Sequence, residues 1–211
     1  MSFKFFTSST TWIVPENIHF IDVECQGGGG NGGQSNESAG GGGGGSGYYK
    51  RNVCIPVKPN EELKIIVGGP GQLSRIVRPL HEILIEAQGG THGSKAKNNN
   101  AGNGGTGFNG GGGGLAHHGI NGQGGYGHNE YGVTGKGAPL KLTEYICGTI
   151  CGPKGGLPTV YGGGGGAAQF SYGKPGSGGS DAIGYGHGGG GGFSNKPGGK
   201  GAPGYIKIFY Y

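Results

Sequence analysis

The sequence has few of the residues that build a globular core and few of those that keep a disordered tail in solution. Only 31% of its 211 residues are hydrophobic and only 13% are charged. The apolar content is low for a globular enzyme, and the charge density is low for a disordered tail. In their place the chain has 60 glycines and 11 prolines. About a third of the chain is therefore glycine or proline, and a core made of side chains cannot account for the whole fold.

Further absences narrow the classes of function. The longest apolar stretches are four or five residues, whereas a membrane-spanning helix needs about 20, so we expect no membrane insertion. The net charge of +5 is spread along the chain, with no basic run longer than Lys50-Arg51, a pattern that does not favour nucleic acid as a partner. Residues 1–12 lack the apolar core of a signal peptide. We therefore expect synthesis in a cytoplasm.

The motifs of enzymes and metal sites are also missing. Residues 199–204 fit the pattern G-x-G-x-x-G, but they precede a predicted strand, whereas a dinucleotide site needs a helix N-terminus at that point. The chain contains no phosphate-binding loop motif, no G-x-S-x-G and no H-E-x-x-H. Its seven histidines show no metal-ligand spacing with the cysteines and are expected to be solvated loop residues. We expect a protein that is not an enzyme and uses no cofactor and no metal.

The four cysteines are Cys25, Cys54, Cys147 and Cys151. If they are oxidised, they allow three pairings, and Cys147 with Cys151 would close a small surface loop. The expected cytoplasmic synthesis favours free thiols.

Short stretches of β-branched and aromatic residues frame the glycine and predict seven or so strands of one small sandwich. Two sets of residues are expected to face its core: Ile21, Val23 and Cys25 in one strand, and Val53, Ile55 and Val57 in another. Residues 58–60 predict a tight hairpin turn and residues 68–71 a wider one. No window has an apolar stripe at helical spacing, so we expect almost no α-helix. The predicted strands are 3–6, 10–14, 18–25, 48–57, 63–67, a stretch within 75–87, and 205–211.

Glycine occurs in unbroken runs at 27–30, 40–45, 110–114, 162–166 and 188–192. Collagen is excluded, because it needs glycine at every third position. A glycine run can instead adopt the extended polyglycine II helix, with three residues per turn and no internal hydrogen bonds. Such helices can satisfy their backbone groups by packing side by side, because only glycine lets backbones approach so closely. We predict a single all-β domain in which a bundle of polyglycine II helices (27–47 and 89–203) stands on a jelly-roll-like β-sandwich (1–26, 48–88 and 204–211).

The direction of the chain predicts which connections meet at the far tip of this bundle. A run that leaves the sandwich after Cys25 must reverse before it returns at Tyr48, which places residues 34–39 at the tip. The same alternation places 95–101, 115–118, 167–172 and 193–197 there, and 180–187 near the base. These connections are solvated turns or, like antibody loops, a binding surface of aromatic and amide side chains. The candidate receptor-binding residues are Asn36, Lys97, Asn99, His117, His118, Phe170, Tyr172, Phe193 and Asn195.

Particular residues link the chain to a known family. They are Thr11-Trp12-Ile13-Val14-Pro15, the stretch from Ile18 into Gly27–Gly30, the run that closes with Gly47-Tyr48-Tyr49, and Gly204-Tyr205-Ile206-Lys207-Ile208. In these features the chain resembles the glycine-rich domain family, which includes bacteriophage tail-fibre and receptor-binding proteins and the glycine-rich ectodomain of anaplastic lymphoma kinase. The resemblance implies a jelly-roll-like sandwich that carries polyglycine II helices, with binding specificity in the connecting loops.

The chain has no kinase domain and no membrane span, which favours a virion protein over a receptor. We expect a receptor-binding protein, or adhesin, of a tail fibre or spike. Its expected partners are a host-surface glycan or outer-membrane protein and other virion proteins, and a jelly-roll base in a virion suggests a homotrimer. The alternative is a structural virion component, such as a capsid decoration, minor capsid or tail-assembly protein. A third reading is a glycine-rich domain of the cytokine-receptor type.

Overall fold

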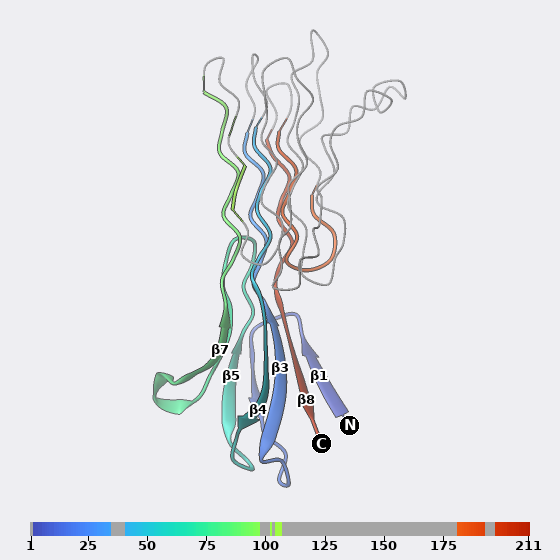
Figure 1. The fold of residues 1–211 in the computed structure, drawn as a ribbon, viewed down its shortest axis with the longest axis vertical. Coiled ribbons are helices and arrows are strands. Elements are labelled where there is room, and N and C mark those ends of the chain that lie inside the picture. The colour runs from blue at the N-terminus through green and yellow to red at the C-terminus, as the bar shows by residue number, and fades with distance from the viewer. Residues whose placement is uncertain (1, 35–40, 98–101, 103, 107–180, 193–196) are drawn as a thin grey trace.

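The computed structural model describes residues 2–34, 41–97, 102, 104–106, 181–192 and 197–211. These residues form an elongated molecule with two parts (Figure 1). A β-sandwich holds both chain termini at one end, and extended glycine-rich chains continue from its strands toward the other end. The described residues contain no α-helix, and their only helical turn is the 3-10 turn Pro79–His81. The predicted all-β fold is confirmed.

The sandwich consists of two four-stranded antiparallel sheets. The strand order is β1-β8-β3-β4 in one sheet and β2-β5-β6-β7 in the other. Two antiparallel sheets packed face to face make a β-sandwich, and the chain crosses from one sheet to the other at four of the seven connections between successive strands. The strands are β1 (Ser2–Phe6), β2 (Thr10–Ile13), β3 (Phe20–Gln26), β4 (Tyr49–Pro56), β5 (Glu62–Ile66), β6 (Ser74–Val77), β7 (Ile83–Ala87) and β8 (Tyr205–Tyr210).

The apolar core lies between the two sheets. In β3 the predicted alternation is confirmed, because Ile21, Val23 and Cys25 are fully buried. In β8 the side chains of Ile206 and Ile208 are fully buried as well. Each aliphatic side chain buried in this way stabilises the fold by about 1.5–3 kcal/mol relative to an exposed one. The opposite sheet contributes Leu63, Ile65, Ile76 and Ile85.

Three details of the strand prediction are wrong. The stretch 75–87 forms the two strands β6 and β7, joined through the turn at Pro79–His81. Residues 58–60 do not close a hairpin, because β4 and β5 belong to different sheets. Val53 is 58% exposed, because the register between β3 and β4 shifts at a β-bulge that turns this side chain away from the core.

The described residues include five glycine-rich segments, four of which adjoin strands of the sandwich. We number them segment 1 (27–34), segment 2 (41–48), segment 3 (88–97), segment 4 (186–192) and segment 5 (197–204). Segment 1 continues β3, segment 2 leads into β4, segment 3 continues β7 and segment 5 leads into β8 (Figure 1). Among the described residues, no helix is long and apolar enough to cross a membrane.

Backbone hydrogen bonds between the segments repeat with a period of three residues. The N–H groups of Gly27, Gly30 and Gly33 donate to carbonyls of segment 2 at 2.8–2.9 Å. Those of Gly29 and Gly32 donate to segment 5, both at 2.9 Å. Every third residue of segment 1 thus faces the same neighbour. A period of three is what a polyglycine II helix predicts, whereas its left-handed twist stays a prediction and the runs 110–114 and 162–166 lie outside the described residues.

Glycine is required in segment 1 by the close approach of its neighbours. A Cβ atom built on Gly30 would lie 1.9 Å from the carbonyl oxygen of Thr91 in segment 3. One built on Gly32 would lie 1.9 Å from the carbonyl oxygen of Gly190 in segment 4. These atoms belong to backbones, which cannot rotate out of the way as a side chain can. The five described segments therefore hold together by backbone contact and hydrogen bonding.

Candidate functional site

The segments meet at a distal end, opposite the two chain termini (Figure 1). We use this name for the last described residues before and after the stretches 35–40, 98–101 and 193–196. The N–H of Gly33 donates to the carbonyl of Gly42 at 2.8 Å, and the N–H of Gly192 donates to that of Gly33 at 2.7 Å. The N–H of Ala96 donates to the carbonyl of Gln34 at 2.9 Å. Segments 1 to 4 are therefore held together at this end.

Of the nine residues that the sequence predicts as receptor contacts, the structure describes Lys97. Its side chain is exposed at the distal end of segment 3. Lys95, in the same segment, and Gln34, at the end of segment 1, are exposed nearby and were not predicted. The other predicted residues lie outside the described part of the chain: Asn36, Asn99, His117, His118, Phe170, Tyr172, Phe193 and Asn195.

A groove of about 350 Å³ runs along the side of the bundle near the distal end. Residues 31–34 of segment 1 form its floor. His92, Gly93 and Lys95 of segment 3 form one wall, and residues 197–200 of segment 5 form the other. The sequence did not predict this groove, because the order in which the segments pack around each other depends on pairings between distant residues.

Two hydrogen bonds fix the orientation of the polar groups at the floor of the groove. The backbone N–H of Asn31 donates to Nδ1 of His92 at 2.8 Å. In this bond Nδ1 of His92 is the acceptor. The side-chain oxygen of Asn31 accepts from the N–H of Gly201 at 2.9 Å, so the side chain of Asn31 keeps its NH₂ group as a hydrogen-bond donor.

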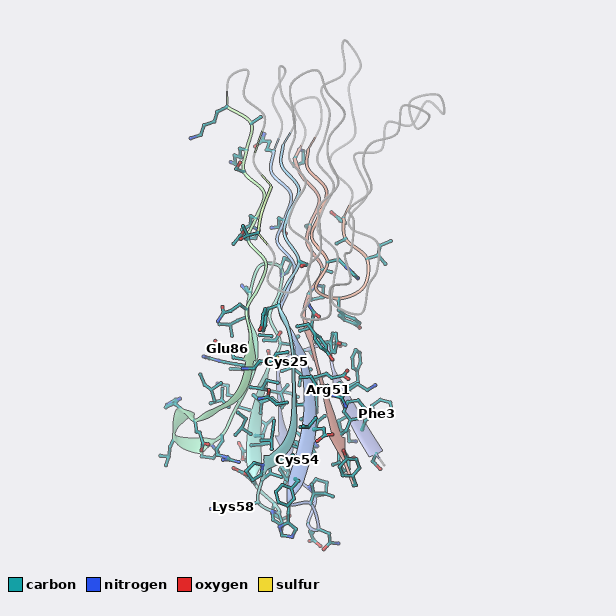
Figure 2. All side chains as sticks on the ribbon, in the orientation of Figure 1. Phe3, Cys25, Arg51, Cys54, Lys58 and Glu86 are labelled. Atoms are coloured by element: carbon teal, nitrogen blue, oxygen red, sulfur yellow. The ribbon has the colours of Figure 1, made fainter. Side chains whose placement is uncertain are left out.

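A second surface lies on the outer face of the sandwich, where β1 pairs with β8. Phe3 lies opposite Phe209, and Phe5 lies opposite Lys207. The Lys207 ammonium group is 4.5 Å from the centroid of the Phe3 ring and 4.6 Å from that of Phe209, which are cation–π contacts. We call this the base aromatic surface; its residues are Phe3, Phe5, Tyr185, Tyr205, Lys207 and Phe209, and Figure 2 labels Phe3.

Tyr185 joins this surface from the residues that precede segment 4. Its ring packs edge-on against Phe5, with the centroids 5.5 Å apart, and against Tyr205 at 5.6 Å. The prediction that residues 180–187 return to the base is therefore confirmed at Tyr185. Phe3 and Phe5 were not predicted from the sequence as residues of a contact surface. The signal was the alternation of aromatic residues in both terminal stretches, which antiparallel pairing brings onto one face.

Asp22 is the main buried charge in the sheet that carries the base aromatic surface. Its carboxylate accepts hydrogen bonds from the Tyr211 hydroxyl at 2.7 Å and from the backbone N–H of Cys54 at 2.8 Å. These two bonds, the one from Tyr211 first, hold the pKa of Asp22 below its ordinary value. The carboxylate therefore stays ionised and fixes the bulge of β4 against the C-terminus. These contacts give Asp22 a structural role.

The described histidines and cysteines form no metal site. Among the residues whose positions are known, no group of three His, Cys, Asp or Glu side chains gathers as ligands. His19, His81 and His92 are exposed. His187 is only 3% exposed, so the prediction of solvated loop histidines is wrong for this residue, because segments 1 and 5 pack against its backbone.

Cys25 and Cys54 are free thiols in very different surroundings (Figure 2). Burial raises the pKa of the Cys25 thiol to about 12, and its sulfur lies 3.2 Å from the carbonyl oxygen of Ser74. Cys54 is exposed. The expectation of free thiols is confirmed for these two residues, whereas Cys147 and Cys151 lie outside the described residues.

This difference predicts selective alkylation. At about pH 8 only about one Cys25 thiol in ten thousand is ionised, and the thiolate is the nucleophile. Iodoacetamide should therefore modify Cys54 in the folded protein, and Cys25 only after denaturation. Peptide mapping by mass spectrometry measures both sites. Equal labelling of the two residues in the folded protein would contradict the buried position of Cys25.

Comparison with known protein families links the chain to one of them. A family model described as a glycine-rich domain matches residues 6–211. No curated protein matches the chain. The matched region takes in most of the sandwich and all five described segments, so the family match refers to the combination of both parts.

Proposed function

We propose that this chain, which belongs to the glycine-rich domain family, is a virion adhesin that binds a host surface through the distal end of its bundle. The observation that carries the proposal is the set of backbone hydrogen bonds that joins segments 1 to 4 at that end. Glycine-rich chains alone are flexible. Bonded to each other, they are a stiff support for the connections that follow them.

A stiff support favours binding because loops that are already held in place lose less entropy when they contact a partner. Binding residues are commonly found on loops that a rigid scaffold positions. The three stretches flanked by distal-end residues contain Asn36, Asn99, Phe193 and Asn195, side-chain types that are common in binding loops. The proposed partner is a host-surface glycan or an outer-membrane protein. We also propose that the chain is not an enzyme.

A second function, a structural virion component, is favoured by the base aromatic surface. Phe3 is 58% exposed and Phe5 is 44% exposed, and exposed aromatic groups of this kind mark surfaces that contact other proteins. The two functions differ in which end of the molecule is buried in the particle. An adhesin attaches by its base and projects its distal end, whereas a structural component buries both.

The test measures adsorption to cells of the virion's host with purified protein. The variants are Lys97→Glu and Phe193→Ala, each compared with Lys58→Glu in the β4–β5 connection at the opposite end of the molecule (Figure 2). We expect the two distal substitutions to weaken adsorption by about tenfold, with no change in melting temperature, and the basal control to bind normally.

Two outcomes would contradict the proposal. If the wild-type protein binds cells and the distal variants bind equally well, the binding site lies elsewhere. If the wild-type protein binds no host surface, the function of a structural component takes its place.

A further inference from the structure

Along one side of its distal half, segment 1 has no backbone neighbour among the described residues. The carbonyls of segment 1 follow the same period of three as its N–H groups. The carbonyls of Gly28 and Asn31 accept hydrogen bonds from segment 3, and the carbonyls of Gly30 and Gly33 accept from segment 4. The carbonyl of Gly29, on the remaining side, accepts from the N–H of Gly71 at 2.8 Å. This donor belongs to the β5–β6 connection, which reaches up from the sandwich.

One helical turn further along segment 1, no described residue takes the position that the β5–β6 connection occupies beside Gly29. By the period of three, the carbonyl of Gly32 faces the same side as that of Gly29, and no described residue donates a hydrogen bond to it. The N–H groups behave in the same way. Gly28 donates to the carbonyl of Gln72, whereas Asn31, one turn further along, donates to the side chain of His92 in place of a backbone. The groove described above is thus the position that one more chain would occupy.

The groove is cationic and rich in donors. Lys95 lies on one wall and Lys200 on the other, and no aspartate or glutamate lines it. Neither ammonium group forms an ion pair with a carboxylate in the described part of the chain. The carboxylate of Asp181 accepts from the backbone N–H of Lys200 at 2.6 Å, but Asp181 does not line the groove.

We infer that this groove binds an acidic oligosaccharide, a sugar chain that carries carboxylate or sulfate groups. The inference rests on the proposed function, because it names the class of receptor that the adhesin recognises. The anionic groups pair with Lys95 and Lys200. A sugar hydroxyl donates to the carbonyl of Gly32, and another oxygen accepts from the NH₂ group of Asn31.

The size and lining of the groove agree with this ligand. Its volume of about 350 Å³ lies at the lower end of the range of about 300–1,000 Å³ for small-ligand sites, which suits a short stretch of a sugar chain. No phenylalanine, tyrosine or tryptophan lines it, and the only aromatic ring among its lining residues is the imidazole of His92. Single-stranded nucleic acid is therefore a poorer fit than a sugar chain, because successive bases stack on several such rings.

The test is titration calorimetry of the full chain with three tetrasaccharides: a uronic-acid oligomer, a sulfated oligomer and a neutral one of equal length. We expect binding of an acidic oligomer and no binding of the neutral one, and the comparison of the two acidic oligomers identifies the anion. The double substitution Lys95→Glu and Lys200→Glu should weaken binding by tenfold or more, because it removes two charged hydrogen bonds. The matched control is Lys58→Glu together with Lys64→Glu on the sandwich, which changes the net charge by the same amount and should leave the affinity unchanged.

Three outcomes overturn the inference. They are equal affinity for the neutral oligomer, an equal loss in the control variant, and tighter binding of an oligonucleotide at the same lysines. Cell adsorption of the same variants separates this inference from the proposed function. If wild type adsorbs to cells but binds no acidic oligomer, the inference fails and the function stands. If it binds the oligomer through the groove but adsorbs to no cell, the inference stands and the adhesin function fails.

Discussion

Replacing Gly30 with alanine is expected to lower the free energy of unfolding by at least about 3 kcal/mol. The added methyl group would lie 1.9 Å from the carbonyl oxygen of Thr91 and 2.5 Å from its carbonyl carbon. The two segments must therefore move apart. Gly30 also donates to Gly45 at 2.8 Å and accepts from Gly189 at 2.9 Å, so the shift breaks hydrogen bonds to two further segments. Each buried group that is left unpaired costs about 1–3 kcal/mol.

Thermal unfolding followed by circular dichroism measures this effect. For a chain of this size, a loss of 3 kcal/mol corresponds to a fall in melting temperature of roughly 6–12 °C. The matched control is Gly69→Ala in the β5–β6 connection, where the nearest atom to the added methyl group is Oε1 of Gln72 at 3.5 Å, an ordinary contact. The control should change stability by less than about 0.5 kcal/mol. Equal melting temperatures for the two variants would contradict a bundle held by backbone packing.

The parts of the fold that could be predicted from the sequence are those governed by local periodicity. The alternation in β3 placed Ile21, Val23 and Cys25 in the core correctly, because in a strand successive side chains face opposite sides. Val53 was misplaced because a bulge depends on how β4 pairs with β3, which its own residues do not reveal. The connection at 58–60 was misread for the same reason: the sequence shows a turn but not which sheet the next strand joins.

The candidate site could likewise be predicted only in part from the sequence. Counting chain reversals places 34–39, 95–101 and 193–197 at one end, and the hydrogen bonds between flanking residues in segments 1 to 4 agree with this. Counting cannot tell which segments lie side by side. The groove forms where segments 3 and 5 flank segment 1 and no other described residue fills the space between them, and this arrangement brings Lys95 and Lys200, which are far apart in the sequence, to the same groove. The base aromatic surface likewise depends on the pairing of the first strand with the last.

Acidification is expected to weaken the bundle through His187. Burial in segment 4 lowers the pKa of His187 below its ordinary value of 6.5. The unfolded chain therefore binds a proton at a pH where the folded chain does not. The stability that His187 contributes is fully present above about pH 6.5. It falls as the pH drops from there toward the lowered pKa of His187 in the folded state. The pKa of Asp22 is also lowered, from 3.8, so the stability that its hydrogen bonds provide is lost only at more acidic pH.

Urea denaturation at several values between about pH 7.5 and pH 4.5 isolates the contribution of His187. The variant His187→Asn keeps a polar side chain but cannot titrate in this window, and its stability should fall less with pH than that of wild type, whatever its stability at neutral pH. His19→Asn, at an exposed site on the sandwich, is the control and should keep the wild-type slope. A wild-type slope in His187→Asn would mean that other groups cause the acid sensitivity. The carbonyl of His187 accepts from Ala202 of segment 5 at 2.8 Å, so the proton would be taken up at the contact between segments 4 and 5.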